Sequence, residues 1–328
     1  MKIPHEVLKI IEDIRTMRVR GAGKIARTAA KALIIASEEY RGTSLKEYLT
    51  YMELIAERLK NARPTAVSLP NAVNYVLSRL KKASMEPSST LNKAKFIVRE
   101  SANDFIKRSF EAIKKIGEIG SKRISDGEVI LTHCNSTAAL SVIITAHHQG
   151  KHIEVFATET RPKFQGHITA KILAKEGIPI TLIPDSAVRY FMKDIDKVIV
   201  GADTVTANGA VVNKVGTSLI ALAAHEARVR VFVAAETYKF SPATVLGELV
   251  MIEERDPTEV VPPEYLYENS EVIVRNPAFD VTPPEYIDAI ITEKGIIPPQ
   301  AAILILEEEY GWVLKDYFIK ELNFAEES

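Results

Sequence analysis

The sequence has a single cysteine, Cys134, among 328 residues, and it has no apolar run long enough to span a membrane. A lone cysteine excludes an intramolecular disulfide and any metal site built from several cysteines, and it is typical of a reducing compartment such as the cytoplasm. Neither sign of charge dominates, because 42 basic residues are balanced by 43 acidic ones, for a net charge of −1. We therefore expect no nucleic-acid or membrane partner, and any anion-binding site must be built locally.

The rest of the composition is that of an ordinary globular protein, with 46% hydrophobic and 26% charged residues. A chain of this length is long for one hydrophobic core, so two domains are expected. In the first part of the chain, apolar residues recur three and four positions apart, which predicts helices. These helices are expected at 5–18, 22–40, 45–60, 70–83 and 88–119. Near residue 125 the helical spacing gives way to short runs rich in Val and Ile. We therefore predict a helical N-terminal domain at 1–124 and a second domain at 125–328.

The second domain alternates short Val- and Ile-rich runs with helical stretches. Strands are predicted at 128–132, 153–157, 179–183, 197–201, 230–234 and 272–274. Helices are predicted near 136–149, 164–176, 186–193, 215–227 and 241–248, with a closing helix at 298–320 around Trp312. This alternation predicts an α/β fold, a Rossmann-like, doubly wound parallel sheet with helices on both faces.

Polar residues follow four of the predicted strands at the points where the strands end. The first is Cys134, and the others are Glu159–Pro162, Gly201–Asp203 and Glu236–Lys239. Because ligands bind at the carboxyl ends of parallel strands, these groups are expected to meet at one site. Two alternatives remain open: Cys134 could be a small buried hydrophobe, and Asp203 could simply cap the next turn.

The residues after Cys134 suit the start of a helix. Asn135, Ser136 and Thr137 have side chains that cap helices, and the positive end of a helix dipole favours a thiolate. His133 lies next to Cys134, but neighbouring strand residues point to opposite faces, so we interpret it as structural.

Two other stretches suit the binding of an anion. Arg20-Gly21-Ala22-Gly23-Lys24 is a glycine-flanked turn with cations that opens a helix, although it lacks the spacing of a P-loop. Asn213 and Lys214 precede a helix start made of small residues. Helix caps explain both stretches equally well. Arg63 and Lys239 are further candidate cations, and Asn208-Gly209 predicts a type I′ hairpin.

Five motifs, taken in order, resemble those of one superfamily. They are Arg20–Gly23, Thr132–Asn135, Glu159–Pro162 with Gln165-Gly166, Gly201–Asp203 with Asn208-Gly209, and Asn213–Thr217. This superfamily comprises sugar-phosphate isomerases related to the regulatory subunits of initiation factor 2B, and the likeness extends from about residue 5 to 318. Three kinds of member compete: archaeal ribose-1,5-bisphosphate isomerases, methylthioribose-1-phosphate isomerases and non-catalytic regulatory subunits.

Residue chemistry distinguishes these three alternatives. The regulatory subunits usually replace the catalytic cysteine and aspartate, whereas this chain has Cys134 and Asp203. A sugar bisphosphate carries roughly four negative charges against about two for a monophosphate, so it needs more cations. The thioether of the thiosugar needs an apolar wall instead. Ser136-Thr137, where the thiosugar enzymes tend to have small apolar residues, and the several candidate cations favour the bisphosphate.

The resemblance implies an aldose–ketose isomerase that converts ribose 1,5-bisphosphate to ribulose 1,5-bisphosphate, in a breakdown of AMP and nucleosides that feeds a carboxylase. It implies that Asp203 is the acid at the ring oxygen and that Cys134 is the base at C2, with a hydride route as the alternative. The implied substrate contacts are Arg20, Gly21, Ala22, Gly23, Arg63, Asn135, Ser136, Thr137, Asn213, Lys214 and Lys239.

The resemblance implies no metal, flavin or nicotinamide, and no GxGxxG motif follows the first predicted strand. It also implies a homo-oligomer, namely a hexamer built from dimers, and activation by AMP. Apolar residues that belong to no predicted strand are candidates for the subunit interface: Val260, Val261, Tyr265, Leu266 and Tyr267.

Overall fold

The computed structural model describes residues 2–63 and 65–311. Its chain divides into two compact units, Met1–Ala112 and Ile113–Ser328. The division falls inside helix α5 (Leu91–Gly120), earlier than residue 124, where the sequence pattern changes. The end of α5 belongs to the second unit because Ile116 is fully buried in the core beneath that unit's sheet.

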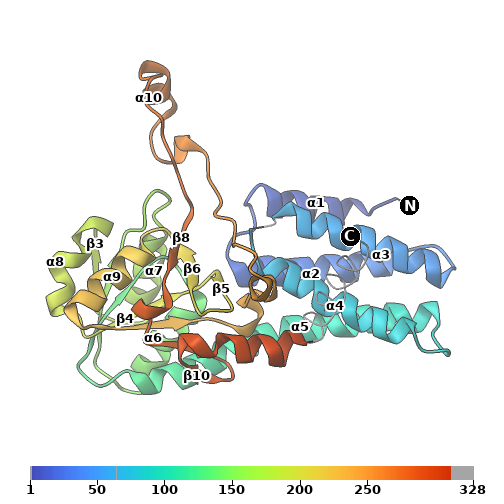
Figure 1. The fold of residues 1–328 in the computed structure, drawn as a ribbon, viewed down its shortest axis with the longest axis horizontal. Helices are drawn as coiled ribbons and strands as arrows, with labels where there is room; N and C mark the ends of the chain where they lie inside the picture. The colour runs from blue at the N-terminus through green and yellow to red at the C-terminus, as the bar shows by residue number, and fades with distance from the viewer. Residues whose placement is uncertain (1, 64, 312–328) are drawn as a thin grey trace. The chain divides into compact units, whose positions relative to one another are not determined.

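The first unit is built from helices (Figure 1). Their bounds are α1 His5–Arg15, α2 Ala22–Glu39, α3 Leu45–Ala62, α4 Ser68–Ser84 and the first part of α5. All five predicted helices are confirmed, with small shifts at their ends. The buried face of α2 is rich in alanine, including Ala26, Ala29 and Ala30, and small side chains let α2 pack closely against its neighbours α1, α3 and α4.

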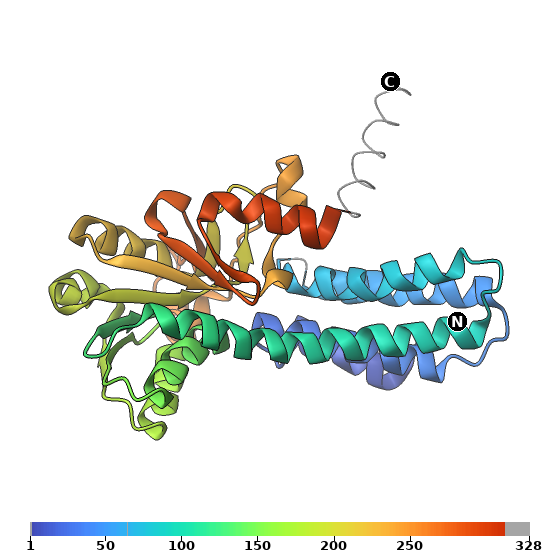
Figure 2. The same ribbon diagram turned by 90° about the horizontal axis from the view of Figure 1, so that it is seen from below.

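The second unit contains a seven-stranded sheet in the order β10-β9-β7-β4-β1-β2-β3 (Figure 2). Its strands are β1 Val129–Thr132, β2 Glu154–Thr158, β3 Ile180–Ile183, β4 Lys197–Gly201, β7 Arg230–Ala234, β9 Ala289–Thr292 and β10 Gly295–Ile297. Neighbouring strands are parallel except β9 and β10. The chain builds β1 to β3 outward and then returns to place β4 on the other side of β1. The strand order therefore reverses between β1 and β4, which is where open α/β sheets bind ligands.

Helices cover both faces of this sheet. The end of α5, α6 (Thr137–His148) and α7 (Gln165–Lys175) pack on one face, whereas α8 (Val188–Phe191) and α9 (Thr217–Ala227) pack on the other. Strand residues alternate between the two cores: Ile130 lies in the first, and Leu131 lies in the second. The doubly wound prediction is therefore confirmed.

Several predicted elements differ from the structure. The strand predicted at 272–274 is wrong: this segment is irregular, and Ile273 is 86% exposed. The helix predicted at 241–248 is a 3-10 turn, η5 (Pro242–Leu246), and the one predicted at 186–193 contains only one short α-helix, α8, flanked by 3-10 turns. Five strands were not predicted, namely β9, β10 and the small antiparallel sheet formed by β5 Thr204–Val205, β6 Val211–Lys214 and β8 Phe279–Thr282. Of these, β5 has two residues and β10 has three, which are too few to show a period of two.

The predicted hairpin joins β5 to β6, but it is not type I′. Only Gly209 takes a positive φ, of 84°, whereas type I′ requires positive φ at both central residues. At the end of the chain, residues 302–311 are helical, and the rest of the predicted closing helix, including Trp312, lies outside the described residues. Within the described chain, no helix combines the length and apolar character that crossing a bilayer requires.

Candidate active site

Cys134 and Asp203 lie at the edge of the sheet where the strand order reverses. Each follows its strand by two residues, Cys134 after β1 and Asp203 after β4, and the two strands pair directly through Leu131 and Val198. Both residues are partly buried. The carboxylate of Asp203 is near enough to raise the pKa of the Cys134 thiol. The structure thus brings the two predicted catalytic residues together.

Burial is the largest influence on the ionisation of Cys134. Burial raises the pKa of this thiol to about 11; Lys214 and the backbone N–H of Asn135 lower it, and Asp203 and Asp185 raise it. The sequence left the ionisation state of this thiol open, and the raised pKa favours its protonated form at neutral pH. The desolvation cost of a buried anion exceeds the stabilisation from one lysine and one helix end.

The backbone of Cys134 is held in an uncommon conformation. Its φ is +66°, in the left-handed region, and its N–H donates to Thr160 Oγ1 at 2.9 Å. The hydroxyl of Thr169 donates to the carbonyl of Cys134 at 2.7 Å. Asp185 accepts from the backbone N–H groups of Thr160 at 2.8 Å and of Arg161 at 2.7 Å.

Sequence reasoning missed Asp185 as a member of the site. Asp185 follows β3 by two residues, which is the signal that identified the other polar clusters. Thr160 belongs to one of those clusters, but nothing in the sequence distinguishes it from its neighbours.

His133 joins the end of β1 to the loop that contains Lys214. Its ring is buried, with Nδ1 bonded to Thr158 Oγ1 and Nε2 bonded to the carbonyl oxygen of Val215 at 2.9 Å. Burial lowers the pKa of this imidazole to about 4, so the ring is neutral at pH 7. His133 therefore has the structural role that we expected.

Two of the three polar residues at the start of α6 contact other residues of the chain. Ser136 Oγ accepts from the N–H of Ala139 at 3.3 Å, which confirms the predicted cap. Asn135 Oδ1 lies 3.2 Å from the hydroxyl of Thr169, whose proton is donated to the carbonyl of Cys134, whereas Thr137 is exposed. A Cβ on Gly201 would lie 2.2 Å from Ser136 Oγ, so the end of β4 requires glycine because α6 begins against it.

The start of α9 holds a carboxylate of the same chain where the sequence predicted a substrate anion. Asp280, on β8, accepts from the N–H groups of Gly216 at 2.7 Å and Ser218 at 3.1 Å. Lys214 Nζ donates to the carbonyl of Ala278 at 2.8 Å. Asn213 is buried, and its amide donates to a hydroxyl on the first residue of α9 at 3.0 Å. This loop therefore presents the ammonium of Lys214, rather than free backbone N–H groups, to the site.

Lys239 forms a buried ion pair. Its ammonium lies 2.7 Å from Glu236 Oε2, with 7% of the lysine side chain and 1% of the glutamate side chain exposed. Tyr238 donates its hydroxyl to the other carboxylate oxygen at 2.9 Å. Although burial opposes ionisation, Lys239 is the main partner that holds the pKa of Glu236 below its usual value. The predicted role of Lys239 as a phosphate ligand thus competes with a structural role.

Lys239→Met is expected to lower the free energy of unfolding by about 3–5 kcal/mol, because it leaves the Glu236 carboxylate buried without its cation. The measurement is urea unfolding followed by circular dichroism. The double variant Lys239→Met/Glu236→Gln should recover most of the loss, since it removes the orphaned charge. Lys193→Met, at an exposed position, is the control. A loss below about 1 kcal/mol in the single variant would contradict the prediction.

Four of the predicted residues of the first unit, Arg20 to Gly23, lie where α2 begins. Gly21 precedes α2 with a φ of +85°, so a glycine is needed there. Arg20 is exposed and donates from Nε to the carbonyl of Met17 at 2.8 Å. Ser68 in α4 donates to the carbonyl of Ala22 at 2.9 Å, and Gly23 lies in the first turn of α2. Arg63 follows the last residue of α3.

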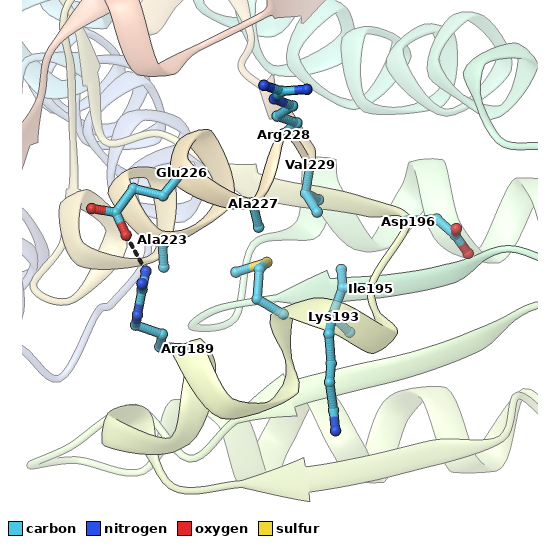
Figure 3. Close-up of a pocket in the computed structure, with 10 residues that line it drawn as sticks. Arg189, Lys193, Ile195, Asp196, Ala223, Glu226, Ala227, Arg228 and Val229 are labelled. Carbon is cyan, nitrogen blue, oxygen red and sulfur yellow. Dashed lines mark hydrogen bonds and ion pairs between the residues drawn. The ribbon is translucent and has the colours of Figure 1, made fainter.

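A separate cavity of about 590 Å³ lies at the amino ends of β4 and β7, opposite the edge with Cys134 (Figure 3). Its lining residues are Arg189, Met192, Lys193, Ile195, Asp196, Ala223, Glu226, Ala227, Arg228 and Val229. An ion pair between Arg189 and Glu226 borders it. None of the predicted site residues lines this cavity.

Comparisons with known proteins show the family of this chain. The model of the initiation factor 2 subunit family matches residues 18–299. The ribose 1,5-bisphosphate isomerase of Thermococcus kodakarensis is 56% identical over 96% of this chain and 98% of its own length. The methylthioribose-1-phosphate isomerase of Acetivibrio thermocellus is 42% identical over 89% of this chain and 88% of its own length.

Among solved structures, the translation initiation factor eIF-2B of Pyrococcus horikoshii OT3 superposes with a TM-score of 0.78 at 34% identity, covering 92% of this chain and 99% of that chain. The family match covers more than half of the chain, and the archaeal relative is more similar in sequence than the thiosugar enzyme. The chain therefore belongs to the initiation factor 2 subunit family, among relatives that are named ribose 1,5-bisphosphate isomerase.

Proposed function

We propose that this protein is an aldose–ketose isomerase that converts ribose 1,5-bisphosphate to ribulose 1,5-bisphosphate. The observation that supports this most is the meeting of Cys134 and Asp203 at the reversal point of the sheet. The relative named for this activity is 56% identical over almost the whole chain. A non-catalytic role is disfavoured because both chemically competent side chains are present and adjacent.

The second candidate reaction is the isomerisation of methylthioribose 1-phosphate, which uses the same chemistry. Charge distinguishes the two, since the bisphosphate has a second anionic group. Lys214 lies near Cys134, and Arg20 and Arg63 provide cations in the helical unit. The relative named for the thiosugar reaction is also less similar, at 42% identity.

The proposed chemistry begins at the blocked anomeric carbon. Because C1 bears a phosphate, the sugar ring opens only when an acid protonates the ring oxygen, and Asp203 is assigned this step. Cys134 is assigned the removal of the C2 proton, which requires the thiol first to lose its own proton. The sulfur then returns a proton to C1, while the C2 hydroxyl gives its proton to the Asp203 carboxylate and becomes the ketone oxygen. Lys214 is the cation that most lowers the pKa of this thiol. A hydride shift from C2 to C1, with Cys134 kept as a thiol, is the competing route.

The test offers ribose 1,5-bisphosphate and methylthioribose 1-phosphate to the purified protein in D2O and follows the ketose by NMR. Turnover of the bisphosphate, with little or none of the thiosugar, supports the proposal; the reverse preference would replace it with the second candidate. Deuterium at C1 of the product supports proton transfer, because a direct hydride shift keeps the substrate's own hydrogen. Turnover of neither sugar would refute both.

Arg20→Ala and Arg63→Ala are each expected to raise KM by about 10–100-fold with a small change in kcat, because a charge-assisted hydrogen bond to phosphate contributes to the ground state and the transition state alike. Steady-state kinetics on ribose 1,5-bisphosphate measures this. Arg18→Ala is the matched control, since Arg18 is exposed and pairs with Asp13 at 3.0 Å. An unchanged KM in both test variants would remove these arginines from the substrate site.

We also propose that the protein assembles as a homo-oligomer, with a hexamer built from dimers as the specific form. A long segment extends from the second unit and ends in α10 (Pro263–Glu268) (Figure 1). Its tip exposes Tyr265 at 40% and Tyr267 at 90%, two of the residues that the sequence suggested for an interface. Activation by AMP remains part of the proposal without an assigned site.

A further inference from the structure

We propose that Thr160 and Asp185 are positioning residues that hold Cys134 in its left-handed backbone conformation and so fix where its thiol lies. This inference rests on the proposed isomerisation, in which Cys134 reacts with the sugar. It adds two residues to the site, neither of which was expected to contact substrate.

The first observation is that two uncommon backbone conformations are bonded to each other. Cys134 has a φ of +66° and Thr160 a φ of +61°, and their loops follow the paired strands β1 and β2. Positive φ is uncommon for residues other than glycine, and for a β-branched residue such as threonine it is an outlier. Such conformations persist only where the surrounding contacts hold them, and they cluster at functional sites.

The second observation is the contacts that hold them. Thr160 is fully buried; its hydroxyl accepts from the N–H of Cys134 at 2.9 Å and donates to the carbonyl of Thr158 at 3.3 Å. Its own N–H donates to Asp185 Oδ1 at 2.8 Å, and the N–H of Arg161 donates to Asp185 Oδ2 at 2.7 Å. Both oxygens of one carboxylate thus hold two successive amides of the loop.

These contacts link three neighbouring strands of the sheet. Asp185 follows β3, Thr160 follows β2 and Cys134 follows β1, and the three strands are adjacent. The φ angle at Cys134 sets the direction of its Cα–Cβ bond and hence the position of Sγ. A displacement of a reacting group by about 1 Å lowers the rate on the order of 10²-fold. We therefore expect the contacts that run from Asp185 through Thr160 to Cys134 to affect kcat rather than the affinity for the substrate.

The experiment compares Thr160→Val with Thr160→Ser in the full chain. Valine keeps the shape but removes the acceptor, so kcat should fall by about 10–100-fold while KM stays within about threefold. Serine keeps the hydroxyl and should keep kcat within about threefold of the wild type. Asp185→Asn retains one acceptor oxygen but loses the second, and it should lower kcat as valine does.

Thiol reactivity provides a readout that does not depend on the sugar. Cys134 is the only cysteine, so alkylation by iodoacetamide reports this thiol alone. In Asp185→Asn the pH profile of alkylation should move to lower pH, because the Asp185 carboxylate raises the thiol pKa in the wild type. In Thr160→Val alkylation at a fixed pH should be faster, because the loop that buries the thiol is released.

Equal kcat in Thr160→Val and the wild type, or an equal loss of kcat in the valine and serine variants, would overturn the proposal. Thermal unfolding shows whether the valine variant folds. If it does not, the proposal is tested by the kcat values of Asp185→Asn and Thr160→Ser. If the wild-type protein isomerises neither sugar, the proposed function is refuted instead. The rate of Cys134 alkylation in Thr160→Val then still tests whether Thr160 holds the loop.

Discussion

Cys134→Ser is expected to lower kcat on ribose 1,5-bisphosphate by about 10³-fold while the affinity for the sugar changes by less than about threefold. Serine fills nearly the same space, but its hydroxyl is far less acidic than a thiol and cannot exchange a proton at neutral pH. The loss therefore appears in the chemical step. Steady-state kinetics measures kcat, and isothermal titration calorimetry with the bisphosphate measures binding.

The pH dependence of this thiol gives a second check on the same residue. Burial raises the pKa of Cys134 to about 11. At pH values below this pKa, the fraction of thiolate increases about tenfold for each unit by which the pH is raised. Alkylation of the wild-type protein should follow this rise and level off only near pH 11. A plateau near neutral pH would show a thiolate instead. Wild-type activity in Cys134→Ser would remove the residue from the reaction.

Asp203→Asn is the second large effect, with kcat expected to fall by about 10²–10⁴-fold, because an amide keeps the shape of the side chain but has no acidic proton to give to the ring oxygen. KM should change little, since the residue acts on the transition state. The same kinetic assay measures both constants.

Asp196→Asn is a matched control for this variant. Asp196 precedes β4 at its amino end, whereas Asp203 follows the carboxyl end of the same strand. Its carboxylate accepts from the N–H of Val129 at 2.8 Å, a bond that the oxygen of asparagine can also accept. We expect kcat within about threefold of the wild type there. Equal losses in the two variants would show that any change to this strand disturbs the enzyme, and would withdraw the specific role of Asp203.

The sequence predicted the parts of the fold that depend on local pattern. The helices of the first unit, the strands β1, β2, β3, β4 and β7, and the alternation of the second unit follow from apolar periodicity, which acts between near neighbours in the chain. The hairpin at Asn208-Gly209 was predicted, but its turn type was wrong because a single residue's φ decides it. The strand β8 was missed because pairing with a distant segment, β6, rather than its own pattern makes it a strand. The strands β5 and β10 pair with neighbouring segments, but they are too short to show a pattern.

Some features of the candidate site could likewise be predicted from the sequence, whereas others depend on the tertiary structure. The sequence by itself determined which edge of the sheet contains Cys134 and Asp203, because polar residues after buried strands must emerge at one end of a parallel sheet. Only the tertiary structure decided that the pKa of the Cys134 thiol is raised, that Asp280 occupies the start of α9 and that Lys239 is paired with Glu236 inside the fold. Ionisation depends on burial and on charges brought close by folding. Asp280 lies more than sixty residues from the amides it binds, and Asp185 about fifty from Cys134, so no local pattern in the sequence records these distances.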